Sequence, residues 1–288
     1  MRAATLAIAV LLWQQPPASG VLLVTVSAGG RPLVDVGIDD FVIEQGGSAG
    51  EVLDVHVADY PLAILLDNSA PAPGEYETIR EAAARFVARI GERAVAAGTL
   101  AGPSAMFATF DDERAKVLGQ IRVAPAAPSS AMPLEAIAAA VRAIQATESP
   151  FSAIVVISAR AIDPSSLGSA DALRPIVDSR IPVHVIARRE SATAGAGSNV
   201  SNVGNVGDVS NVGDASDVLK EVSSLTRGQY TTIYSTASYA IALDRLADRL
   251  ATEIMVQYLV PPGAPAGGQV RAGVKIPGAR VTGLGVSR

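Results

Sequence analysis

Cysteine is absent from the 288-residue sequence. This excludes thiol catalysis, disulfide bonds and cysteine-based zinc sites together. Histidine is nearly absent as well, since only His56 and His184 are present. His56 lies in an alternating β segment and is predicted to be a surface or interface residue, whereas His184 lies in an apolar strand and is predicted to be packed and hydrogen-bonded in the core. With two histidines and no Gly-x-Ser-x-Gly motif, a Ser-His-Asp hydrolase is not favoured.

Aromatic residues make up only 4% of the chain, although hydrophobic residues make up 49%. Any core must therefore be built from Val, Leu, Ile and Ala, which is typical of buried parallel sheets covered by helices. The chain also has no excess of positive charge, because its formal net charge is −5. Its Lys and Arg residues form no cluster along the sequence. Since nucleic-acid-binding proteins normally present a basic face, nucleic acid is not an expected partner.

The N-terminus has the pattern of a secretory signal peptide. Arg2 precedes an apolar run over residues 3–13, and small residues follow up to Gly20. The run is too short to span a bilayer, which needs about 20 apolar residues. We therefore predict removal of residues 1–20, a mature chain without a transmembrane segment, and a secreted, periplasmic or cell-envelope location. An uncleaved N-terminal membrane anchor is the alternative.

Hydrophobic periodicity predicts a β-rich region at both ends of the mature chain and an α/β domain between them. Residues 21–58 form strands but are too few to bury a core alone, so we predict that they pair with residues 259–288 of the C-terminal β segment 257–288. The predicted central strands are residues 62–66, 104–110, 116–123, 153–157, 182–187 and 229–234, and the predicted helices are residues 79–90, 134–144, 171–178, 218–225 and 239–254. This alternation predicts an α/β fold with a doubly wound, mostly parallel open sheet over residues 59–256.

Ligands of such sheets bind outside the carboxyl ends of the strands. The loops after Leu66, Ile157 and Ala187 are therefore the candidate binding loops. The first of them begins Asp67-Asn68-Ser69. An acid at the end of a buried strand, followed by a hydroxyl two residues later, can offer oxygen ligands to Mg²⁺ or another hard cation.

The segment 62–71 resembles the first strand and the metal-ion-dependent adhesion loop, Asp-x-Ser-x-Ser, of von Willebrand factor A domains. Three further segments resemble parts of a von Willebrand A-related family of secreted bacterial proteins. Residues 30–33 with 40–46 are similar to the strand pair before the A domain. Residues 226–230 are similar to a Thr-Gly-Gly-x-Tyr turn, and residues 257–261 are similar to the exit from the last helix. The resemblance covers nearly all of the mature chain in order, and it implies a von Willebrand A/Rossmann-like sheet with a small β side module from both ends.

The sequence departs from that family at most of the metal-ligand positions. Pro71 stands where the family has Ser, Ala131 where it has Thr, and Ala159 where it has Asp. Only Asp67 and Ser69 remain of the five usual positions, and two protein oxygens would hold Mg²⁺ weakly. We therefore expect a degenerate adhesion site with no cofactor, or at most weak Mg²⁺ or Ca²⁺ binding.

A cation adjacent to this site could replace the metal's charge. Arg160 follows Ala159, and an inward-pointing guanidinium would pair with the Asp67 carboxylate. Asp111, Asp112 and Asp163 could instead supply missing ligands, but solvated turn acids are the favoured interpretation for all three.

Residues 198–218 repeat a triplet of the type Ser/Gly-Asn/Asp-Val/Ala. Such a low-complexity segment cannot build a core and is expected to be a flexible loop. The alternative is a loop that becomes ordered on contact with a partner or with Ca²⁺.

These observations predict an exported, non-catalytic module that recognises a protein or cell-surface ligand. The predicted contact residues are Asp67, Asn68, Ser69, Ser130, Ser158 and Arg160. A metal-dependent adhesion module, a secreted hydrolase that uses Asp67, and a structural envelope component remain alternatives. The identity of the partner and the oligomeric state leave no pattern in the sequence.

Overall fold

A computed structural model describes residues 18–72, 74–102, 106–160, 173–189, 217–265 and 268–287. The described residues divide into two compact units, one within Val57–Glu253 and the other within Met1–His56 together with Ile254–Arg288. Nearly all of the predicted signal peptide and of the triplet segment lies outside the described residues. None of the described helices is both long and apolar enough to cross a membrane.

The Val57–Glu253 unit is built on a six-stranded sheet with the order β11-β10-β9-β6-β7-β8. Neighbouring strands run parallel except β8, which is antiparallel to β7. The strands are β6 (Leu62–Leu66), β7 (Val95–Thr99), β8 (Met106–Ala108), β9 (Ala153–Ser158), β10 (Val183–Arg188) and β11 (Tyr230–Ile233). Every residue of β6 and β9 is buried, as expected for parallel strands covered on both faces. The predicted α/β class with a mostly parallel sheet is confirmed.

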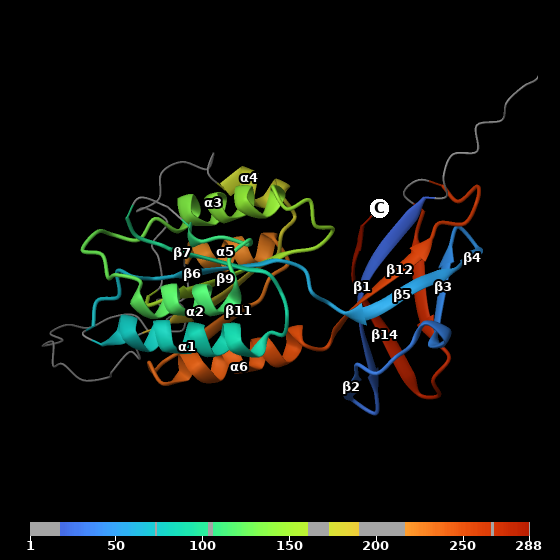
Figure 1. Cartoon of the computed structure of the whole chain (residues 1–288), viewed down its shortest axis with the longest axis horizontal. Coiled ribbons are helices and arrows are strands. Elements are labelled where there is room, and N and C mark those ends of the chain that lie inside the picture. The colour runs from blue at the N-terminus through green and yellow to red at the C-terminus, as the bar shows by residue number, and fades with distance from the viewer. Residues whose placement is uncertain are drawn as a thin grey trace, which may run out of the picture. The chain divides into compact units, whose positions relative to one another are not determined.

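Helices cover both faces of this sheet (Figure 1). On one face lie α1 (Glu75–Arg89), α2 (Arg114–Val123) and α6 (Ser238–Leu250), and on the other lie α3 (Pro133–Gln145), α4 (Leu173–Asp178) and α5 (Val218–Leu225). Each long helix buries one apolar stripe. In α3 the stripe includes Leu134, Ile137, Val141 and Ile144, which pack with sheet residues in one core.

Three details of the predicted secondary structure are wrong. The predicted strand over 116–123 is the helix α2, whose buried residues Val117 and Ile121 are four positions apart, one helical turn. The predicted helix over 239–254 ends at Leu250, and the apolar run after it forms strand β12. Strand β7 was not predicted, because its sequence VAAGT is dominated by Ala and Gly, which are depleted in strands.

The second unit contains two antiparallel sheets. A five-stranded sheet has the order β14-β1-β12-β5, with β2 paired to β1, and a three-stranded sheet has the order β13-β3-β4. The elements are β1 (Ser19–Ala28), β2 (Arg31–Leu33), η1 (Ile38–Asp40), β3 (Phe41–Gln45), β4 (Ser48–Gly50), β5 (Val52–Val57), β12 (Glu253–Leu259), β13 (Val270–Val274) and β14 (Ala279–Ser287). Val24 of β1, Val256 of β12 and Phe41 of β3 share one core, so residues from both ends of the sequence are needed to bury it.

Candidate functional site

The strand order creates a topological switch point between β6 and β9. The chain continues from β6 to β7 on one side, and from β9 to β10 on the other. At such a point the loops diverge and leave a crevice outside the carboxyl ends of the strands. Asp67 directly follows β6 and Ser158 ends β9, and the Asp67 amide donates to the Ile157 carbonyl at 2.9 Å. The structure therefore brings the candidate loops after Leu66 and Ile157 together.

The Asp67 carboxylate is fully buried and is bound by protein donors. Its Oδ1 accepts from the Ser69 backbone N–H at 3.1 Å and from the Ser69 hydroxyl at 2.7 Å. Its Oδ2 accepts from the Ala159 backbone N–H at 3.0 Å, and the Ser158 hydroxyl lies 3.5 Å away. The Ser158 proton has a better acceptor in the Arg160 carbonyl at 2.7 Å. Three hydrogen bonds from protein donors thus occupy both oxygens of the buried carboxylate.

Arg160 reaches this carboxylate through Ser69 and not directly. Its Nη2 donates to the Ser69 hydroxyl oxygen at 3.1 Å, and that hydroxyl donates to Asp67. The Ser69 hydroxyl therefore connects the guanidinium to the buried carboxylate through two hydrogen bonds. Arg160 itself is exposed, so it places a positive charge at the surface of the loop.

Asn68 is used to hold the loops together. Its side chain is 5% exposed, donates to the carbonyls of Ala101 at 3.2 Å and Pro125 at 3.4 Å, and accepts from the Ala101 N–H at 2.9 Å. Ala101 also forms a β-bridge with Ala131, which brings the loop that contains Ser130 and Ala131 beside the Asp67 loop. Ser130 is exposed in that loop, and within the described residues no hydrogen bond joins its side chain to Asp67 or Ser69.

The donor set does not fit a hard cation. Asp67 and Ser69 supply the only side-chain oxygens of the family pattern, because Ala131 and Ala159 supply none. Among the described residues no group of three or more His, Asp or Glu could hold a metal ion. Asp112 is engaged elsewhere, by the Lys116 ammonium at 2.5 Å and the Thr109 N–H at 2.9 Å, and these contacts lower its pKa. Asp163 lies outside the described residues.

A buried polar cluster contacts the end of β9 beside the Asp67 loop. The sequence pattern did not predict it. The Glu75 carboxylate is fully buried and is bound by the Arg188 guanidinium through two hydrogen bonds, one of them 3.1 Å long. The Tyr239 hydroxyl lies 3.2 Å from Glu75 Oε1 and 3.1 Å from the Ser158 carbonyl oxygen. Burial and the charge of Glu75 raise the pKa of Tyr239, so its hydroxyl stays protonated. The cluster joins α1, β9, β10 and α6.

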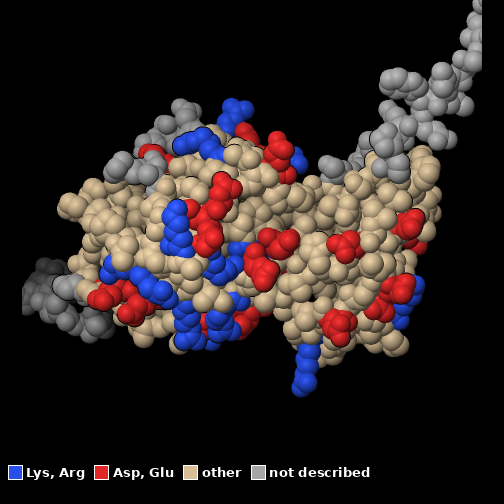
Figure 2. All heavy atoms as spheres, viewed as in Figure 1, with Lys and Arg blue, Asp and Glu red and all other residues tan. Residues whose placement is uncertain are grey.

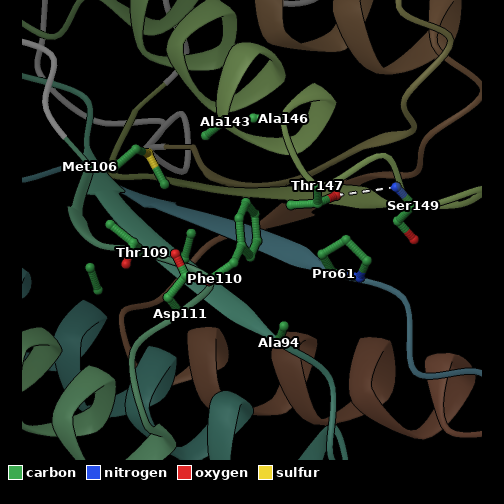
Figure 3. A pocket seen from close by; sticks show the side chains of 12 residues that line it. Pro61, Ala94, Met106, Thr109, Phe110, Asp111, Ala143, Ala146, Thr147 and Ser149 are labelled. Atoms are coloured by element: carbon green, nitrogen blue, oxygen red, sulfur yellow. Dashed lines mark hydrogen bonds between the residues drawn. The ribbon is translucent and has the colours of Figure 1, made fainter.

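A hollow of about 530 Å³ lies between α3 and the β7–β8 side of the sheet. Phe110 extends into it, and Thr147 and Ser149 lie at its rim (Figure 3). Its described walls are mostly apolar, and among the described residues Asp111 is the only ionisable one that lines it. A hydrolase would need a nucleophile with a nearby general acid or base, and no hydrogen bond joins Asp111 to a hydroxyl among the described residues of this hollow.

Charges of both signs are interspersed on the face that carries α1 and α2 (Figure 2). Many of them are paired there: Asp244 lies 2.6 Å from the Arg85 guanidinium and 3.1 Å from that of Arg89. On this face the described residues form no basic patch of the kind that nucleic acid requires.

Both histidines form hydrogen bonds with neighbouring residues. His184 is 6% exposed and accepts the Gln229 N–H at 3.0 Å, so its predicted place in the core is confirmed. His56 is partly exposed, and its Nδ1 lies 2.9 Å from Asp54 Oδ2.

No protein-family model matches the sequence, and no curated protein matches it. Solved structures do match. Proximal thread matrix protein 1 from the mussel byssus, with a zinc-occupied MIDAS motif, is 11% identical, covers 72% of this chain and 49% of its own, and has a TM-score of 0.50. An aerotolerance-related membrane protein from Bacteroides fragilis is 16% identical over 66% of this chain and 98% of its own, with a TM-score of 0.45. A von Willebrand factor type A protein from Catenulispora acidiphila is 14% identical over 94% of this chain and 72% of its own, with a TM-score of 0.44.

Proposed function

We propose that this chain, whose Val57–Glu253 unit is a von Willebrand factor A-like domain, is a non-catalytic module that binds a protein or cell-surface ligand outside the cytoplasm without a metal ion. The observation that carries the proposal is the set of hydrogen bonds at Asp67. Both carboxylate oxygens are bound by protein donors, and the exposed cation at the loop is the Arg160 guanidinium.

The chemistry of Arg160 suggests what the ligand offers. A guanidinium has five N–H donors, and the contacts described above use one of them, on Ser69. Carboxylate groups match the planar fork of the remaining donors, and such charge-assisted pairs are strong. We therefore propose an acidic side chain of the partner at Arg160, with Ser69 and Ser130 as neighbouring hydroxyl contacts.

The N-terminal pattern of Arg2, the apolar run and the small residues up to Gly20 supports export. The division into a central unit and a β unit built from both ends of the chain supports the proposed β side module. The enzyme alternative has less support, because the Asp67 carboxylate beside the Ser69 hydroxyl is buried and is also bound by backbone donors. Among the described residues that line the hollow beside Phe110, Asp111 is the single ionisable side chain.

Binding of the full exported chain to envelope fractions of its source organism tests the proposal. We expect saturable binding that EDTA leaves unchanged and that Arg160→Glu weakens by about tenfold or more, since hydrogen bonds between charged groups contribute about 1.5–3 kcal/mol. Arg174→Glu is the matched control, because the Arg174 side chain is 85% exposed on α4.

Loss of binding in EDTA would contradict the metal-free proposal and favour metal-dependent adhesion. Equal binding by the Arg160→Glu and wild-type chains would contradict the role of this loop.

A further inference from the structure

A second cluster of side chains lies at the opposite edge of the same sheet. Asp67 follows the carboxyl end of β6, whereas His184 is the second residue of β10, near the amino end of a parallel strand. A hollow of about 180 Å³ opens there between β10, β11 and α6. Its apolar walls include Ile186 and Leu246, and its lining contains no Asp or Glu in the part of the chain that the structure describes.

Two arginines of α6 line this hollow. Arg245 and Arg249 are four residues apart and therefore lie on one face of the helix. The acids of α6 are engaged on another side, since Asp244 and Asp248 pair with Arg85 and Arg89 of α1. Among the described residues, neither Arg245 nor Arg249 forms an ion pair with a carboxylate.

Glu253 is an acid near Arg249: burial raises the pKa of its carboxyl, and the hydrogen bond from Tyr60 and the charges of Arg93 and Arg249 oppose that rise. Its carboxylate is already occupied, because it accepts from the Tyr60 hydroxyl at 2.5 Å and lies 3.6 Å from the Arg93 guanidinium. Glu253 is therefore not available as an acceptor for the Arg249 guanidinium.

The buried ring of His184 adds a further donor. Burial and the charge of Arg249 lower the pKa of His184 to about 3, so the ring is neutral near pH 7. Nδ1 accepts the Gln229 N–H at 3.0 Å, which places the ring proton on Nε2. Arg249 Nη2 lies 3.2 Å from Nδ1 and 3.3 Å from Nε2. The Nε2–H and the guanidinium are both donors, so they cannot satisfy each other.

The geometry points to an anion site: we propose that this hollow binds a phosphate group, held by Arg245, Arg249 and the His184 Nε2–H. Gln229 and Thr231 also line the hollow and offer an amide and a hydroxyl. A phosphate group carries several acceptor oxygens and so can receive donors from several side chains at once, whereas a carboxylate has two oxygens. The site is independent of the proposed recognition at Asp67.

Titration of inorganic phosphate into the ¹⁵N-labelled full chain, at constant ionic strength, tests the site. We expect saturable shifts of the amide signals of Gln229, Thr231 and the C-terminal half of α6. Arg245→Gln and Arg249→Gln should each weaken binding by about tenfold, since each removes a charge-assisted contact. The matched control is Arg280→Gln, because Arg280 is exposed in the β unit and its replacement changes the net charge equally.

A parallel titration with O-phospho-L-serine separates two sources of the group. Tighter binding of phosphoserine would identify a phosphoester, and equal or weaker binding would identify free phosphate. An absence of saturable shifts would overturn the proposal. So would a loss of affinity in Arg280→Gln as large as in Arg249→Gln, because binding would then follow net charge and not this hollow.

Discussion

Replacing Glu75 with alanine should lower the free energy of unfolding by about 3–5 kcal/mol, the usual cost of removing one partner of a buried ion pair. The Glu75 side chain is fully buried and that of Arg188 is 14% exposed. Without Glu75 the guanidinium would keep its charge with no described carboxylate beside it, and the Tyr239 hydroxyl would lose one of its two acceptors. Urea denaturation monitored by circular dichroism measures the difference.

Glu81→Ala is the control for this experiment. Glu81 is exposed on the same helix, and we expect its replacement to change stability by less than about 0.5 kcal/mol. A Glu75→Ala variant as stable as the Glu81→Ala variant would show that the cluster under the loop contributes little to the folded state.

The second large effect concerns pH. Burial and the charge of Arg249 lower the pKa of His184 from 6.5 to about 3. Between these values the unfolded chain binds a proton that the folded chain does not, so the folded state loses stability as the pH falls. The contribution is fully present above pH 6.5 and decreases by about 1.4 kcal/mol per pH unit below it.

Unfolding of the wild-type chain and of His184→Gln, compared at several pH values from 7 to 5, isolates this contribution. Carboxylates common to both chains cancel in the difference. We expect wild type to lose stability relative to the variant by about 2 kcal/mol between pH 6.5 and 5. A difference that does not change with pH would contradict the neutral, buried imidazole.

The fold was predictable where burial imposes a simple pattern on the sequence. The runs Leu62–Leu66 and Ala153–Ser158 are apolar throughout because helices cover both sides of those strands. Strand β7 lacks this signal, since three of its four buried positions are Ala or Gly and only Val95 is a larger apolar residue. In α2 only Val117 and Ile121 are buried, and two residues are too few to distinguish a helix from a strand by periodicity.

The candidate site was predictable only in its local part. Asp67, Ser69 and Ser158 could be placed together because they end or follow neighbouring parallel strands. The Asn68 side chain points inward, and its hydrogen bonds join three loops. Its orientation depends on the conformation of those loops, which no local pattern in the sequence indicates. Glu75 lies 113 residues from Arg188 and 164 from Tyr239 in the sequence. A first-turn glutamate by itself indicates a helix N-terminus, and nothing local reveals its distant partners.

Isothermal titration of Mg²⁺, Mn²⁺ and Ca²⁺ into the full chain tests the central claim most directly, with Asp67→Asn as the control. If the Ser69 and Ala159 donors satisfy the Asp67 carboxylate and Arg160 supplies the positive charge of the loop, the expected result is no saturable heat up to millimolar metal in either chain. Micromolar binding that disappears in Asp67→Asn would contradict the claim, because it would show that a metal ion completes this loop.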